Sequence, residues 1–545
     1  MARTISGGSR LTQLDQFMIP PAILPQPKIY FQPPGGMHTG VRLDMIPPSM
    51  GRLVQNLVIR DGAYKTRDAV DFVGAAGDGE VAYATEILLS NGDSWLIRWT
   101  ETGLEYYDTG SWVGVLNGTL AKSDGASMVT ITGWNDTVVF STQLGKCWLL
   151  SFATVPTLTD LTESPVNVTH LTTFAGRIIA SVLGTRIYWT VKNDNTDWTG
   201  LGSGFEDLIG SPGGMVDTQC GVVPISDEIA FAIRANRVWQ MTQTGNFDAP
   251  FAFGQLIASV GSIAPSTLCS LPGAAAFLSK DNVVIVSPSG GKQEVGDPLR
   301  RTINALGREY LRYACMVYDP REDELRLSIP DGDGQLNQKV WRYNRKADAW
   351  TQDSYQFGIR SISFSRYLQS IVTIDGLDAI SGTIDGLPGI IDELGVTDKT
   401  AGCIYAMADD SHRVAHDAYT RNNTSDRDTD FAGVYVPGGW RIESGYILPG
   451  TSIEKTQVIE VQLEYESEGS QDIAFEYSDD GGQNWTEFDR TTVSDTNDQS
   501  LILSVRKHIY RDRIQLAVSC EDSKTIRLIA MHVFTAKGAR IADAS

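Results

Sequence analysis

Hydrophobic and polar positions repeat along the middle of this chain in short units. Each unit is an apolar strand, a polar turn and a second strand, and successive units start roughly 40–50 residues apart, as propeller blades do. The first strands of six units are Ser94–Trp99, Asp136–Phe140, Arg177–Val182, Glu228–Ile233, Ala274–Leu278 and Glu324–Ser328. The pattern predicts an all-β fold, a β-propeller of about six to eight blades.

The second strand of each unit follows a tight turn and often carries an aromatic residue. These strands are Leu104–Tyr107, Cys147–Leu150, Arg186–Trp189, Arg237–Trp239, Val283–Val286 and Val340–Tyr343. Most of the turns contain Gly, Asn or Asp, which tolerate the positive φ that tight hairpins require. Helical periodicity is weak throughout, and its best candidate is Pro298–Leu311.

The N-terminal part, residues 1–55, has a different pattern, with apolar residues between prolines. The pairs Pro20-Pro21, Pro33-Pro34 and Pro47-Pro48 exclude a sustained helix or a central strand. Disordered linkers contain fewer apolar residues than this segment does. We therefore expect an extended arm that lies on a surface, either of its own chain or of a neighbouring copy.

The remaining chain divides into a propeller at residues 56–425 and a β-sandwich at residues 426–545. A small repeat near residues 373–400, in which Thr373–Leu377 recurs as Thr383–Leu387, predicts a looped insert. The polar stretch at 409–430 marks the boundary between the two domains. Alternating strands then predict the sandwich: Thr456–Tyr465, Ile473–Tyr477, Leu501–Val505, Ile514–Val518 and Ile526–Phe534.

The net charge and its distribution limit the possible partners. The 545 residues carry a formal net charge of −21, which disfavours sequence-independent binding of nucleic acid because phosphates are repelled. Residues 1–60 are the exception, with six cationic side chains against two acidic ones. This basic segment predicts docking onto an acidic surface such as a neighbouring copy. The alternative is a solvated leader whose charge is incidental.

The six cysteines are scattered without paired spacing, so we expect free buried thiols and no zinc site. Residues Met1–Leu24 lack the apolar core of a signal peptide. No apolar run reaches the ~18 residues of a membrane-spanning helix, so no stable membrane insertion is expected.

One short motif resembles a known structural element. Ser478–Trp485 matches the pattern S-x-D-x-G-x-x-W of the Asp-box in sialidase-like and BNR-repeat proteins. In this motif Asp480 and Gly482 would shape a tight hairpin turn, and Trp485 would pack beneath it. The chain has one copy, outside the propeller, so the motif predicts structure and not sialidase activity.

Other candidates for chemistry have weaker patterns. Asp331–Gly334 could form a calcium loop, but it lacks the later bidentate Glu, so a hairpin turn is the preferred interpretation. His412 and His416 have the i, i+4 spacing of metal ligands but lie in a polar boundary segment, where a solvated loop is the alternative. The signatures HExxH, GxSxG and the P-loop are absent from the sequence. We predict no catalytic, cofactor-binding or metal-binding residues, no cofactor, and no enzymatic activity.

Three phrases resemble one protein family. Asn56–Arg67 resembles the phrase that precedes the first blade in bacteriophage tail proteins, Trp341–Trp350 resembles a blade ending of the same proteins, and Phe475–Trp485 is similar to hairpins of virion modules. Together they resemble the tail-hub, or nozzle, proteins of short-tailed phages, also called packaged-DNA stabilisation proteins. The resemblance covers most of the chain in layout.

This resemblance implies a structural virion protein of the tail, made in the host bacterial cytoplasm. Such proteins form a hexameric ring below the portal and adaptor proteins and above the tail fibre, spike or needle proteins. DNA passes through the channel without specific binding, so acidic side chains are expected to face the channel. Two alternatives remain: a carbohydrate- or receptor-binding tail protein, in which the C-terminal domain binds glycans, and a cytosolic scaffold propeller.

Overall fold

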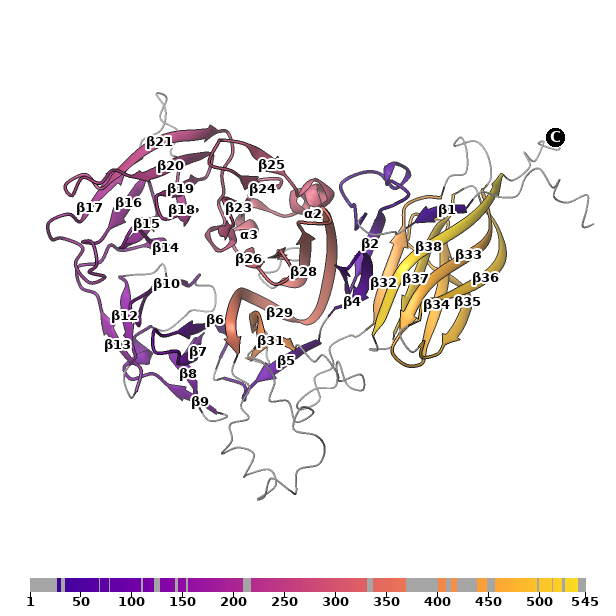
Figure 1. Ribbon diagram of the computed structural model, residues 1–545, viewed down its shortest axis with the longest axis horizontal. Helices are drawn as coiled ribbons and strands as arrows, with labels where there is room; N and C mark the ends of the chain where they lie inside the picture. Colours follow the sequence, from indigo (N-terminus) through magenta and orange to yellow (C-terminus); the bar gives the residue numbers. More distant parts are fainter. Residues whose placement is uncertain are drawn as a thin grey trace, which may run out of the picture.

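The regular secondary structure of the described residues is almost all β-strand (Figure 1). The computed structural model describes residues 27–30, 35–67, 69–77, 79–108, 111–121, 128–142, 146–152, 155–208, 217–330, 337–368, 400–407, 413–418, 439–447, 456–496, 499–511, 513–521 and 525–537. The predicted insert up to residue 399, the boundary segment at 419–430, the loop Asp331–Gly334, His412 and residues 1–26 lie outside this description. In the described part, no helix is long and apolar enough to cross a membrane.

Five separate sheets each contain four antiparallel strands in chain order. The first two are β6 (Val81–Leu88), β7 (Ser94–Thr100), β8 (Leu104–Asp108) and β9 (Ser111–Gly114), then β10 (Thr130–Trp134), β11 (Thr137–Ser141), β12 (Trp148–Ser151) and β13 (Thr157–Asp160). The next two are β14 (Val168–Phe174), β15 (Arg177–Val182), β16 (Arg186–Trp189) and β17 (Gly204–Asp207), then β18 (Gln219–Pro224), β19 (Ile229–Arg234), β20 (Arg237–Gln243) and β21 (Phe251–Ala258). The fifth is β22 (Cys269–Leu271), β23 (Ala274–Leu278), β24 (Val283–Val286) and β25 (Lys292–Glu294).

A sixth group of strands completes the ring through one long strand. β26 (Cys315–Asp319), β27 (Glu324–Ser328), β28 (Asn337–Asn344) and β29 (Ala349–Leu368) pair in order, and the second half of β29 then pairs with β30 (Thr400–Met407). β30 pairs with β31 (Val414–Ala418), and β31 pairs with β5 (Ala69–Val73). A strand from near the N-terminus thus closes a ring of sheets around a common centre, which is a β-propeller (Figure 1).

Every predicted strand of the six units is present, so the prediction of an all-β propeller is confirmed. The first strands are the second strands of their sheets, β7, β11, β15, β19, β23 and β27, and their partners are the third strands. These two positions are flanked by strands on both sides and are the most buried; for example, Ile178, Ile179 and Ala180 are shut off from solvent. Their sequences are therefore rich in apolar residues, which makes them the easiest strands to recognise.

Within the described residues, helices are few and short. They are η1 (Leu43–Met45), η2 (Gly118–Ala121), η3 (Pro265–Thr267), η4 (Asp297–Leu299), α2 (Arg300–Ala305) and α3 (Arg308–Leu311). The predicted helix at Pro298–Leu311 is interrupted at Leu306, whose backbone is extended, and at Gly307. Leu299, Ile303 and Leu311 still face the core, as the helical pattern predicted.

The strands at both ends of the chain form a second unit beside the ring, on the right in Figure 1. One of its sheets contains β3 (Leu57–Arg60), β4 (Ala63–Thr66), β38 (Ile526–Lys537), β33 (Thr456–Ser467) and β36 (Leu501–Arg511), with β1 (Pro27–Tyr30) added to β38. The other runs through β2 (Gly51–Gln55), β32 (Trp440–Ser444), β37 (Gln515–Cys520), β34 (Gln471–Ser478) and β35 (Thr486–Val493). Both sheets bury apolar residues in one core cluster.

The N-terminal strands differ in place from the predicted layout. β1 and β2 belong to the predicted arm, and Asn56–Arg67, interpreted as the opening of the propeller, forms the β3–β4 hairpin. β1 and β4 pair with the C-terminal strand β38, and β2 pairs with the C-terminal strand β32 and with the propeller strand β29. Their apolar residues, for example Leu57 and Tyr64, are completely buried in the core that they share with the C-terminal strands.

Candidate functional site

The Asp-box forms the turn between β34 and β35, as the motif predicted. The carboxylate Oδ1 of Asp480 accepts hydrogen bonds from the backbone N–H groups of Gln483 and Asn484, both at 3.0 Å, and from the Ser478 hydroxyl at 2.7 Å. These bonds, the Asn484 backbone N–H first, hold the pKa of Asp480 well below its usual range. The carboxylate is therefore a structural acceptor in its charged form.

The rest of the Asp-box contacts two arginines from other strands of the same sheet, Arg441 of β32 and Arg52 of β2. Arg441 lies over the Trp485 ring, with its Cζ 4.8 Å from the ring centroid. Arg52 Nη1 donates to the Gly481 carbonyl oxygen at 2.6 Å. Since one face of the tryptophan is covered by a guanidinium, this face cannot serve as a stacking platform for a sugar ring.

Of the predicted histidine pair, the structure describes His416 alone. It lies in β31, and its Nδ1 is 3.0 Å from the carbonyl oxygen of Asp417. His416 is thus part of a propeller strand and not of a solvated loop, because β31 is needed to pair with β5 and complete the ring.

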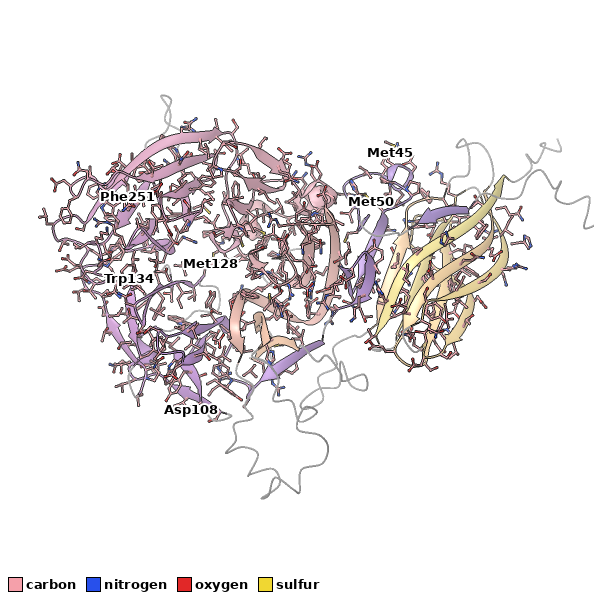
Figure 2. The ribbon with its side chains drawn as sticks, in the orientation of Figure 1. Met45, Met50, Asp108, Met128, Trp134 and Phe251 are labelled. Carbon is pink, nitrogen blue, oxygen red and sulfur yellow. The ribbon has the colours of Figure 1, made fainter. Side chains whose placement is uncertain are left out.

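The centre of the propeller holds a cavity of about 510 Å³. First strands of several sheets line it, and Met128 lies beside it on the inner side of the ring (Figure 2). Among the described lining residues no carboxylate occurs, and the charged side chain is Arg360, which is paired with Glu80 at 2.8 Å. Burial raises the pKa of the lining thiol Cys315 to about 12, so it is not a thiolate nucleophile at neutral pH.

One histidine faces this cavity from β14. The Nδ1 of His170 is shut off from solvent, and among the described groups it has no hydrogen-bond partner. Burial lowers the pKa of His170 to about 4, so the imidazole is neutral under physiological conditions. A Cβ at Gly221 would lie 2.7 Å from the His170 ring, which means that the ring packs directly on the next sheet.

A cluster of buried charges joins β26 and β27 to β31. Arg326 donates from Nη1 to Oδ2 of Asp417 at 2.6 Å and from Nη2 to Oδ2 of Asp319 at 2.7 Å. Arg321 Nη2 also donates to Asp319 Oδ2 at 2.7 Å, and the Tyr405 hydroxyl donates to Asp417 Oδ1 at 3.0 Å. Both carboxylates are buried and have arginine partners, as buried charges require.

Part of this cluster has the composition of a metal site. Ligand atoms of Asp319, Cys403 and Asp417 lie within 4.8 Å of one another. The two carboxylates are already neutralised by Arg326 and Arg321, and burial raises the pKa of Cys403. A cation would have to displace both guanidinium groups, so the cluster holds strands together and does not fit a metal ion.

Asn56 occupies the junction between the propeller and the second unit. Its backbone N–H donates to the Gln352 carbonyl oxygen at 2.8 Å, and its side-chain oxygen accepts from the Ser354 N–H at 2.9 Å, both in β29. Its amide nitrogen donates to the Gly439 carbonyl oxygen at 2.7 Å, next to β32. With φ at 56°, Asn56 is in the left-handed region, which asparagine tolerates better than most residues.

The sheet itself also crosses this junction. β2 pairs in parallel with β29 at Gln55 and Gln352 and antiparallel with β32, where Val54 is opposite Ile442. A hydrogen-bonded sheet therefore runs without interruption from the propeller into the second unit.

Comparisons with known proteins add a general likeness in fold. No protein-family model matches this chain, and no curated protein matches it. The WD40 β-propeller domain of Doa1 is 9% identical and is aligned over 65% of this chain and 98% of that domain, with a TM-score of 0.37. The Pan2 WD40 domain of Neurospora crassa is 10% identical and is aligned over 66% of this chain and 98% of that domain, with a TM-score of 0.38. A catalytically inactive virginiamycin B lyase from Staphylococcus aureus with quinupristin is also 10% identical, over 64% of this chain and 98% of that chain, with a TM-score of 0.38.

Sequence reasoning missed the charged cluster and the junction. Arg326 and Asp417 each lie inside a strand, where a single charge in a short pattern is ordinarily assigned to the exposed face. A usable signal was available at Asn56, because an Asn directly before an apolar hairpin often adopts positive φ.

Proposed function

We propose that this chain is a structural, non-enzymatic virion protein, a subunit of the ring-shaped tail nozzle of a short-tailed phage. The ring would extend the DNA channel below the portal and adaptor, retain the packaged genome and let it pass on ejection. The observation that carries this proposal is the uninterrupted sheet β29–β2–β32. A subunit of a tube must keep its parts in fixed orientation, and main-chain hydrogen bonds across the junction supply that rigidity.

The proposal includes the finer architecture. Five separate four-stranded sheets and the two four-stranded groups that share β29 make a seven-bladed propeller, within the expected range. The strand β5 completes the seventh blade, as closure by an N-terminal strand requires. The two sheets of the second unit form a β-sandwich, built from residues 27–66 and 439–537, into which the propeller is inserted.

Charge supports a tube that carries DNA without binding it. Each copy has a formal net charge of −21, and six copies would carry −126, so phosphates would be repelled from the assembly. The sandwich would contact neighbouring virion proteins, such as the adaptor above or the fibre, spike or needle proteins below. The protein would be located in the virion tail after synthesis in the bacterial cytoplasm.

The centre of the propeller supports a non-enzymatic role. Its cavity combines a neutral histidine, His170, with an arginine that Glu80 already neutralises. A general acid–base group works best with a pKa near the working pH, and a thiol attacks as its thiolate; pKa values of about 4 for His170 and about 12 for Cys315 suit neither role.

Native mass spectrometry and negative-stain microscopy of the purified full chain test the proposal. We expect closed rings of six copies and no hydrolysis of glycans. A protein that stays monomeric up to about 50 μM and binds defined glycans on an array would instead support the carbohydrate-binding alternative; at such concentrations a subunit contact of ordinary micromolar affinity would be populated.

A further inference from the structure

Exposed large apolar side chains are concentrated on one part of the propeller. Of twelve such residues in the described chain, nine lie between Leu88 and Phe247, on the first four sheets. The described residues 251–418, which form the rest of the ring, have none. Two of the remaining three, Leu501 and Ile502, lie on β36 of the second unit. This uneven distribution indicates that both places are covered in an assembly.

Three exposed apolar residues of two neighbouring sheets are here called the rim patch: Leu201, Phe205 and Phe247. They are 78%, 51% and 50% exposed. Leu201 and Phe247 lie in the loops that join the third and fourth strands of two neighbouring sheets. A Cβ at Gly202 would be 2.9 Å from the Phe247 ring, so the ring lies on the backbone beside Leu201. Phe247 therefore touches the loop that carries Leu201, while the guanidinium of Arg186 lies over Phe205, with its Cζ 4.0 Å from the ring centroid.

Acidic residues border the rim patch. Asp248 follows Phe247 in its loop, whereas Glu206, next to Phe205 in β17, points to the opposite face of that strand. Glu228 lies on the adjoining turn, and its carbonyl oxygen accepts from the Gln243 N–H at 3.2 Å. Glu228 and Asp248 are exposed, and within the described residues neither is in an ion pair. A partner of this surface must therefore offer apolar side chains beside positive charge.

The strand β36 has these properties and is here called the edge patch. It is the last strand of its sheet, so one of its edges has no partner strand in the described chain. Leu501 is 41% exposed and Ile502 66%. Farther along the strand Arg506 and Lys507 are exposed; Arg506 is paired with Glu460 at 3.3 Å, but its side chain keeps 80% exposure. Basic side chains thus accompany the exposed apolar ones.

We propose that the edge patch of one copy docks on the rim patch of a second copy. Apolar side chains would meet apolar ones, and the cations of β36 would face the acidic border of the rim. β17 and β36 lie at opposite ends of the molecule (Figure 1), so the contact is heterologous and passes from copy to copy. The inference rests on the ring assembly of the proposed function and names the surfaces that build it.

Two double variants of the full chain test the pairing. Phe205→Glu with Phe247→Glu removes the rim patch, and Ile502→Glu with Lys507→Glu removes the edge patch. Each variant alone is expected to be monomeric by mass photometry, with self-association weakened at least about tenfold. An equimolar mixture is expected to form 1:1 dimers and nothing larger, because exactly one complementary pair of surfaces survives in the mixture. All the substituted side chains are exposed, so circular dichroism melting curves should match those of the wild type.

The outcomes separate the surfaces from the ring. Met45→Glu is the matched control, since Met45 is 67% exposed but lies outside both patches, and it should assemble as the wild type does. If either double variant still forms wild-type rings, or the mixture gives no dimer, the pairing is overturned while the ring proposal stands. If the wild type itself is monomeric at every concentration, both proposals are overturned.

Discussion

Arg326 and Asp417 form a buried ion pair at the place where the propeller ring closes. The Arg326 Nη1 and the Asp417 Oδ2 are 2.6 Å apart, and the two side chains are 1% and 5% exposed. Arg326 comes from β27 and Asp417 from β31, so the pair links the last two groups of strands across β29. Burial by itself would raise the pKa of Asp417, but the arginines, Arg326 first, outweigh burial and hold it well below its usual range.

Breaking this pair is expected to destabilise the whole propeller. Arg326→Met leaves Asp417 buried with fewer cationic partners, and loss of one member of a buried pair lowers the free energy of unfolding by about 3–5 kcal/mol. Arg490→Met is the control, because the Glu487–Arg490 pair is 43% exposed on both sides and its loss should have a much smaller effect on stability. Equilibrium unfolding in urea measures the free energy of unfolding of both variants. Equal effects of the two substitutions would contradict the closing role of Arg326.

His170 predicts a loss of stability in mild acid. Its folded pKa of about 4 is below the unfolded value near 6.5, so the unfolded chain binds a proton first as the pH falls. Stability should therefore decrease from pH 6.5 down to about pH 4, by up to about 3 kcal/mol from this residue. His170→Gln should flatten that part of the pH profile. Melting temperatures measured between pH 4 and pH 8 test this prediction.

Asn56 is expected to couple the unfolding of the two units. Asn56→Ala removes the hydrogen bonds to Ser354 and Gly439 and strains a backbone at φ 56°, so we expect a loss of about 2–4 kcal/mol. Asn56→Gly loses the same hydrogen bonds without the backbone strain and should be the milder change. Calorimetry should show one transition in the wild type and two in Asn56→Ala. A single transition in every variant would mean that Asn56 does not carry the coupling.

The Asp-box carboxylate is expected to hold the β34–β35 turn. Asp480→Ala should speed hydrogen exchange at the amides of Gln483 and Asn484, which lose their acceptor. Since the folded pKa of Asp480 is lowered, its contribution is present above the unfolded value near 3.8 and is lost as the pH falls below it. Asp479→Ala, next to it in the turn, is the control and should leave this exchange unchanged. Equal exchange in both variants would contradict the role of Asp480.

The local sequence predicted the elements that depend on neighbouring residues. The second and third strands of six propeller sheets were recognisable because they are short and rich in apolar residues, and the turn Ser478–Trp485 because its hydrogen bonds lie within eight residues. The seventh group of four strands was not recognisable. Its strands are β29, β30, β31 and β5, and β5 is more than 300 residues away from β31 along the chain.

By itself, then, the sequence determined an all-β chain with a propeller repeat, a second group of strands and an acidic surface, since composition, period and turn chemistry are local properties. Tertiary structure alone decided that Ala69–Val73 closes the ring, that the β3–β4 hairpin joins the C-terminal sheets, and that Arg326 is buried against Asp417. Strand pairing between distant segments depends on shape and burial in the folded core. A charged residue in a strand reveals its buried partner only after the chain has brought the two together.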